Sequence, residues 1–135
     1  MIDIEQDVFS LLVADIKADY PDAFVTGEYV KALTAFPCIS IMESDNSTET
    51  STTDSSLNEN HADVMYTIDV YSNKTSGKKS ECKAIFRIID KRLIGLGFKR
   101  IALSPIPNME DATIYRMVGR YRATVSKENV IYNKR

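Results

Sequence analysis

The single histidine and the two cysteines are the first residues to consider for chemistry in this chain of 135 residues. His61 and Cys82 could act as base and nucleophile, but they fall on different predicted elements and no third group is evident to orient the histidine. Cys38 and Cys82 are too few for a disulfide framework, and we interpret them as reduced, half-buried thiols. These residues therefore do not predict nucleophilic catalysis.

Carboxylates form a second candidate group, because carboxylate oxygens are the ligands that hard cations prefer. Asp45, Glu59, Asp63 and Asp69 could hold such a cation, but their spacing is irregular and no Asp-x-Asp-x-Asp-Gly loop occurs. Solvated charge is the better interpretation. Phosphate-binding glycine loops, Gly-x-Ser-x-Gly strings and paired zinc ligands are also missing from the sequence. We therefore expect no enzyme, no metal and no cofactor.

Basic side chains are the most informative group. Arg116, Arg120 and Arg122 share one face of a predicted strand, over roughly 20 Å at about 3.4 Å per residue. Four further basic residues repeat every four positions along a predicted helix: Lys79, Lys83, Arg87 and Lys91. Together the two groups could line a path for a polyanion, or form salt bridges to another subunit. The alternative is a solvated strand face. No aromatic residue of this strand alternates with the arginines on their own face, so stacking on bases is not expected.

The net charge of −2 conceals a strong difference between the two halves of the chain. Residues 1–73 contain 14 acidic and two basic side chains, a balance of −12, and residues 74–135 contain 15 basic and five acidic ones, a balance of +10. Such an asymmetry indicates an electrostatic partner, or pairing between copies of the chain. The alternative is that the halves interleave in the fold, so that the charges intermingle.

Two helices are predicted from hydrophobic spacing. The first ends before Pro21, and its buried stripe is predicted to contain Ile4, Val8, Leu11, Leu12 and Ile16. The second covers residues 78–94 and ends at Gly95 and Gly97, with a core stripe of Cys82, Ile85, Phe86, Ile89 and Leu93.

Period-two alternation and turn residues predict the strands. They cover residues 24–30, 37–43, 62–72, 98–103 and 113–125, with a further edge strand at 130–132. A loop containing Pro105 and Pro107 is expected between the fourth and fifth of these.

A polar segment interrupts this pattern. Nine of the 13 residues from Ser44 to Ser56 are serine or threonine, and none is apolar. Because such a segment has nothing to bury, we expect a mobile loop at about residues 44–60. Its carboxylates are the candidate docking residues: Asp45, Glu49, Asp54 and Glu59.

These elements predict an α+β fold, with one mainly antiparallel sheet of about four to five strands and two helices packed on one face. A chain of this length fits a single domain, here residues 1–135. The apolar stretches are too short to cross a membrane and the N-terminus is acidic, unlike a signal peptide. We therefore expect a cytoplasmic protein with no membrane partner.

Several short strings, taken in order, resemble one known family. They are Phe36-Pro37, Glu59-Asn60, Val70-Tyr71-Ser72-Asn73 with Gly77-Lys78-Lys79, Leu96-Gly97-Phe98, and the segment from Pro107 to Arg122. In this order the strings resemble the tail-terminator, or tail completion, proteins of long-tailed bacteriophages and prophages. The resemblance extends from Phe36 to Tyr132, and none of its strings is catalytic.

The resemblance implies a structural virion protein that assembles in the host cytoplasm. Such a subunit forms a hexameric ring on the last ring of the tail tube, stops tube growth and meets the connector of the head. The partners it implies are other copies of the chain, the tail tube protein, the neck proteins and the phage DNA that passes through the ring. Another head–tail connector or neck adaptor is the first alternative, and a small metal-dependent nuclease is the second.

Overall fold

A computed structural model describes residues 1–28, 30, 33–48, 61–106, 113–126 and 131–132. The helices are α1 (Glu5–Asp19) and α2 (Lys78–Leu96). The strands are β1 (Phe24–Thr26), β2 (Cys38–Thr48), β3 (His61–Ser72), β4 (Lys99–Ile106), β5 (Tyr115–Ser126) and β6 (Ile131–Tyr132). The predicted α+β class is confirmed.

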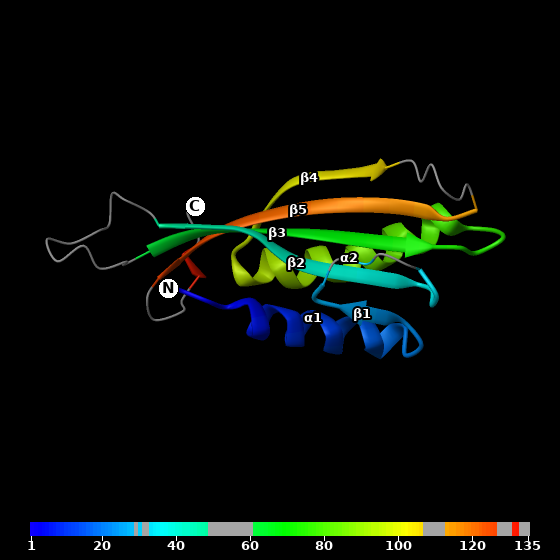
Figure 1. The fold of residues 1–135 in the computed structure, drawn as a ribbon, viewed down its shortest axis with the longest axis horizontal. Coiled ribbons are helices and arrows are strands. Elements are labelled where there is room, and N and C mark those ends of the chain that lie inside the picture. Colours follow the sequence, from blue (N-terminus) through cyan, green and yellow to red (C-terminus); the bar gives the residue numbers. More distant parts are fainter. Residues whose placement is uncertain (29, 31–32, 49–60, 107–112, 127–130, 133–135) are drawn as a thin grey trace, which may run out of the picture.

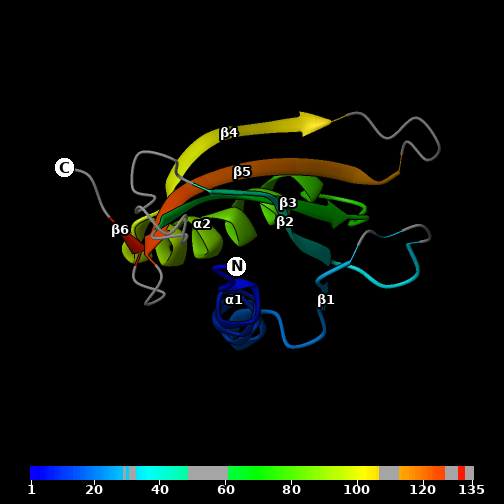
Figure 2. The ribbon, with the colours of Figure 1, turned by 60° about the vertical axis from the view of Figure 1, so that its left-hand side comes forward.

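One sheet organises the molecule. Its strands run in the order β1-β2-β3-β5-β4, and β6 pairs with β5. Every pairing is antiparallel except that of β1 with β2, which is parallel. The two helices lie on the same face of the sheet, with α1 below β2 and α2 below β3 and β5 (Figures 1 and 2). We call the opposite face the open face.

The core lies between the helices and the sheet. Alternate residues of β3 and β5 point into it, and Tyr66 and Tyr121 are its largest fully buried side chains. The ring of Phe98 meets that of Tyr66 edge-on, with 5.6 Å between centroids. At Gly119 the backbone passes so close to Phe86 that an added Cβ would lie 2.6 Å from the ring. Sheet and α2 are therefore tightly packed here.

The first helix has its expected bounds but not its full predicted stripe. The Asp3 carboxylate accepts the Glu5 amide at 3.0 Å, and acids in the first turn suit the positive end of the helix dipole. Val8, Leu12 and Ile16 are buried, as predicted. Leu11 is 36% exposed, so its predicted burial is wrong. A helix lying on a sheet buries a narrower arc than the apolar spacing of this sequence suggests.

The second helix begins and ends on glycines with positive φ. Gly77 precedes it with φ of 83°, and Gly97 ends it with φ of 108°. Gly95 lies inside the helix, so only Gly97 is the predicted exit. At the start of α2 the buried Glu81 accepts the Ser72 hydroxyl at 2.7 Å and lies 3.5 Å from the Lys74 ammonium. These contacts attach the first turn of α2 to the end of β3.

The polar segment after Glu43 begins as strand. Ser44 to Thr48 belong to β2, which continues past a bulge and pairs with β3 as far as Ala62. A backbone ladder needs no apolar side chains, and the Asn46 amide also donates to the Ile2 carbonyl at 2.7 Å. The prediction that the mobile loop starts at residue 44 is therefore wrong, and residues 49–60 lie outside the described residues.

Two other strands differ from their predicted bounds. β4 extends to Ile106 and includes Pro105, which was predicted to lie in a loop. An edge strand accepts proline, because one side of its backbone has no ladder to complete. β1 is shorter than predicted, and its parallel pairing with β2 was not predicted. Among the described helices, none is long and apolar enough to cross a membrane.

Candidate functional site

The three candidate arginines lie on the open face of β5, in different environments. Arg116 is held by residues of β3: its guanidinium lies 2.8 Å from the Asp69 carboxylate and 5.5 Å from the centre of the Tyr71 ring. Only 27% of the Arg116 side chain is exposed. Arg116 therefore stabilises the β3–β5 pair, and less of its charge is available to a partner.

Arg120 and Arg122 are exposed, and neither makes a hydrogen bond or ion pair with another described residue. In the ladder Arg120 lies opposite Thr67 and Ala102, and Arg122 lies opposite Met65 and Lys99. Like charges directly across a strand pair repel one another, so an anion near Arg122 and Lys99 would be stabilising. This part of the open face can contact phosphates without reading bases.

A second basic surface lies on the helix side. Lys83, Arg87 and Lys91 line a groove of about 310 Å³ between α2 and β4. Arg100 of β4 is the fourth basic residue there, and Phe86 and Leu103 add apolar surface. Lys79, one turn nearer the start of α2, is exposed but is not among the lining residues. The groove is therefore basic, with a partly apolar floor.

Asp90 is the acidic residue of this groove. Its carboxylate accepts the Arg100 guanidinium at 3.0 Å and the Tyr121 hydroxyl at 3.1 Å. Burial and the Asp90 charge raise the pKa of Tyr121, so its hydroxyl keeps its proton and remains a donor. Asp90 thus orients Arg100. It does not pair with Lys83, Arg87 or Lys91, so the charges of these three groove residues remain available for another contact.

The two basic surfaces do not form one path. β5 presents Arg120 and Arg122 on the open face, whereas α2 lies on the opposite face (Figure 2). The expectation that the arginines and the α2 stripe line a common path for a polyanion is therefore wrong. The two surfaces are separate.

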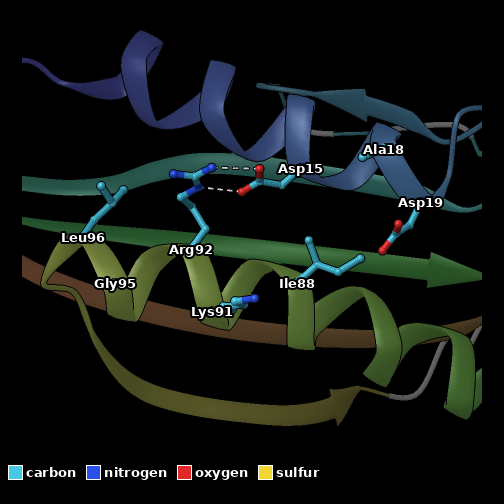
Figure 3. A pocket seen from close by; sticks show the side chains of 8 residues that line it. All are labelled: Asp15, Ala18, Asp19, Ile88, Lys91, Arg92, Gly95 and Leu96. Carbon is cyan, nitrogen blue, oxygen red and sulfur yellow. Dashed lines mark hydrogen bonds and ion pairs between the residues drawn. The ribbon is translucent and has the colours of Figure 1, made fainter.

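A cleft of about 550 Å³ lies between the helices. Figure 3 shows the Asp15 carboxylate of α1 held by the Arg92 guanidinium of α2, at 2.6 and 2.9 Å. The hydrogen bond from Arg92 lowers the pKa of the Asp15 carboxyl. Burial partly offsets this shift, and the charge of Lys91 adds to it. The described lining residues include no serine, threonine, cysteine or histidine. The pair therefore joins the helices.

The cysteines are poor nucleophiles in this fold. Burial raises the pKa of Cys38 to about 11 and that of Cys82 to about 12, so both stay as thiols at neutral pH. The Cys82 thiol is directed at the Val70 carbonyl, 3.6 Å away, near one end of β3. His61 begins β3, on the order of 30 Å from Val70 at about 3.4 Å per residue. The fold therefore keeps His61 and Cys82 apart.

The candidate carboxylates have separate partners. Asp69 pairs with Arg116, Asp63 accepts the Thr124 hydroxyl at 2.8 Å, and Asp45 accepts the Ser47 hydroxyl at 3.1 Å. Across the described ranges, no group of three or more His, Cys, Asp or Glu residues is placed to hold a metal ion. Of the docking candidates, Asp45 belongs to β2, while Glu49, Asp54 and Glu59 lie outside the described residues.

Sequence reasoning missed three residues of these surfaces. Arg92, Arg100 and Asp90 received no role, although Arg100 could have been found beside Lys99 at the start of a strand. The ion pair of Arg92 with Asp15 joins residues far apart in the chain, so no local pattern signals it.

The fold and its surfaces define a class: a two-layer α+β domain whose charged side chains along α2, β4 and β5 are mainly basic. No protein-family model matches the chain, and no curated protein matches it.

Proposed function

We propose that this protein is a structural virion subunit, a tail terminator of a long-tailed bacteriophage. In this proposal six copies form a ring at the head-proximal end of the tail tube. The ring ends tube growth, joins the tail to the connector of the head and leaves a channel for DNA. The subunit catalyses no reaction.

The observation that carries the proposal is the distribution of charge across the sheet. α1, β1 and β2 lie toward one edge, and β5 and β4 lie toward the other (Figure 1). Up to Thr48 the described residues include nine acidic side chains and one basic one, Lys17. The described residues of α2, β4 and β5 include eleven basic and two acidic side chains. In the described residues the halves therefore form an acidic flank and a basic flank, which are joined by the Arg92–Asp15 and Arg116–Asp69 ion pairs.

Opposite flanks suit a ring. A closed ring needs a heterologous interface, in which two different patches of each subunit are complementary. The acidic flank of one copy attracts the basic flank of the next, whereas two like flanks repel. A symmetric dimer through either flank would therefore be disfavoured.

The open face supports a channel for DNA. If neighbours meet through the two flanks, the faces of the sheet become the inner and outer surfaces of the ring. Arg120, Arg122 and Lys99 then give one of these surfaces a positive patch that can contact phosphates in any sequence. Passage of DNA requires such contacts to be non-specific.

Mass photometry and negative-stain electron microscopy of the purified protein test the proposal. We expect rings at low salt, and fewer rings as salt screens the flanks. Added to tail tubes, the rings should cap one end and stop elongation. Rings that bind the head connector but ignore tail tubes would favour a neck adaptor instead. A monomer that cleaves DNA when Mg²⁺ is added would contradict the proposal.

A further inference from the structure

The helix layer of this subunit is incomplete. Two helices cover the sheet, and α2 is the one beside β4, where a groove remains between them. Leu103 lies opposite Gly119 in the ladder and therefore points to the helix side, yet it is 38% exposed. Ile101 of the same strand is 47% exposed. The helix-facing side of β4, with Leu103 and Ile101, is thus only partly covered and has room for a further element. We call this side the shelf.

The backbone edge of β4 is a poor site for adding a strand. The strand has a bulge between Arg100 and Ala102, a proline at position 105, and two charged residues, Lys99 and Arg100, at its start. Bulges, prolines and charges are the features by which edge strands resist pairing with another chain. A partner at this flank must therefore dock through side chains on the shelf.

The solvent-exposed side of α1 has matching properties, and the last residue of this side, Ala18, also lines the cleft between the two helices. Asp7, Leu11, Ala14 and Ala18 are exposed and fall at helical spacing, so they share one side of the helix. Leu11 is the large apolar side chain of this stripe, and the two alanines beside it allow close approach. Asp3 and Asp7 make the start of the helix acidic. The stripe is thus an apolar ridge with negative charge at one end.

We propose that the exposed side of α1 of one copy docks in the groove between α2 and β4 of a second copy. The inference deepens the proposed ring and rests on it. Leu11 packs on Leu103 beside Phe86, and the acids of α1 face Lys83 and Arg87. This is helix-in-groove recognition, in which an apolar anchor sits between complementary charges. It adds a third helix to the layer and explains why Leu11 is exposed.

Charge decides between this arrangement and its rivals. A contact of α1 with α1 would bring acids together, and a contact of groove with groove would bring Lys83, Arg87 and Lys91 together. Both are repulsive, whereas α1 in the groove is attractive. Each copy also has one ridge and one groove, so the contact can repeat around a ring.

Disulfide trapping tests the geometry. Leu11→Cys and Leu103→Cys proteins are mixed with oxidised glutathione, and covalent dimers are measured on non-reducing gels. The control mixture replaces Leu103→Cys with Ser104→Cys, an exposed neighbour whose side chain points to the open face. The native Cys38 and Cys82 are buried thiols and stay in place. We expect a rapid covalent dimer in the first mixture, and little in the control or in either protein alone.

Charge exchange gives a second, independent readout. Arg87→Glu should weaken association by about tenfold, and adding Asp7→Lys to the same chain should restore most of it. Circular dichroism checks that both variants fold. Rings that persist without the trapped dimer would overturn the docking inference and leave the proposed ring standing. Absence of any oligomer would overturn both.

Discussion

Glu43 is a carboxyl group strongly altered by its surroundings. It lies on β2 opposite Tyr66, and its backbone amide donates to the Glu5 carboxylate at 3.1 Å. Burial, followed by the charges of Glu5 and Asp3, raises the pKa of Glu43 to about 7, although a hydrogen bond from Asn46 opposes the shift. At neutral pH this carboxyl is therefore partly protonated in the folded state and ionised in the unfolded state.

Glu43→Gln should make the protein more stable at alkaline pH. Because the folded-state pKa is raised from 4.5, the contribution of Glu43 to stability is fully present below about pH 4.5 and is lost as the pH rises through about 7. The glutamine variant lacks this titration, so its unfolding free energy should exceed that of wild type at pH 8 by on the order of 1–3 kcal/mol. Urea unfolding at pH 5 and pH 8 measures the difference. The control is Glu28→Gln, which removes an exposed charge from the same flank. Equal gains in both variants would contradict the role of burial.

Gly119 is required by close packing, because an added Cβ would lie 2.6 Å from the Phe86 ring. We expect Gly119→Ala to lower the unfolding free energy by about 1–3 kcal/mol, since the buried ring must move. Gly95→Ala is the matched control: that glycine lies inside α2 with nothing within 4 Å of the new Cβ. It should stabilise the protein by roughly 0.5–1 kcal/mol. Thermal unfolding compares them, and a neutral Gly119→Ala would mean that the contact relaxes freely.

At the scale of the element, α1 has two adjacent leucines with opposite roles. Leu12 is fully buried, and Leu11 is 36% exposed. Leu12→Ala should cost about 2–5 kcal/mol of unfolding free energy, because it leaves a cavity in the core. Leu11→Ala should change the stability of the monomer by less than about 1 kcal/mol. Denaturant unfolding at a concentration that keeps the protein monomeric makes the comparison. Similar losses for both would place Leu11 in the core.

The elements were predictable where local rules decide them. The start of α1 follows from its acids, the end of α2 from Gly97, and β3 from the period-two spacing of Ala62, Val64, Tyr66, Ile68 and Val70. The prediction was wrong where the position of a strand in the sheet determines the local structure. Ser44 to Thr48 are strand because β3 supplies a ladder, and Pro105 is strand because β4 lies at an edge.

For the candidate surfaces, the sequence predicted only which residues of a single helix or strand share a face. The spacing of Arg120 and Arg122 correctly places them on one exposed face of a strand. Spacing along one element cannot show that Arg116 is paired with Asp69 of another strand. It also cannot show that α2 and the open face lie on opposite sides of the sheet. Those facts depend on strand order, which joins residues far apart in the chain.

For the whole molecule, the open face predicts separable effects on folding and on DNA contact. A double variant, Arg120→Glu with Arg122→Glu, should fold with a stability within about 0.5 kcal/mol of wild type, since both side chains are exposed. Its non-specific DNA binding should have a shallower salt dependence, by about 0.9 in logarithmic slope for each lost phosphate contact. Fluorescence anisotropy at several salt concentrations measures this slope.

Lys17→Glu is the control for this variant, because it reverses an exposed charge on α1. It should leave the salt dependence unchanged. If the double variant binds DNA and completes infectious particles as the wild type does, Arg120 and Arg122 have no role in DNA contact and their face is a solvated surface.

The ladder between β3 and β5 is also the boundary between the acidic and basic halves of the chain. The Arg116–Asp69 ion pair crosses this ladder, and the Arg92–Asp15 ion pair joins the two halves in the helix layer. A cut after Asn73, which is exposed and follows β3, would separate fragments of charge −12 and +10. We expect these fragments, residues 1–73 and 74–135, to associate when they are co-expressed and to re-form the sheet through the β3–β5 ladder. Because their attraction is electrostatic, recombination should slow steeply as salt is added. The chain would then behave as two complementary pieces of one fold.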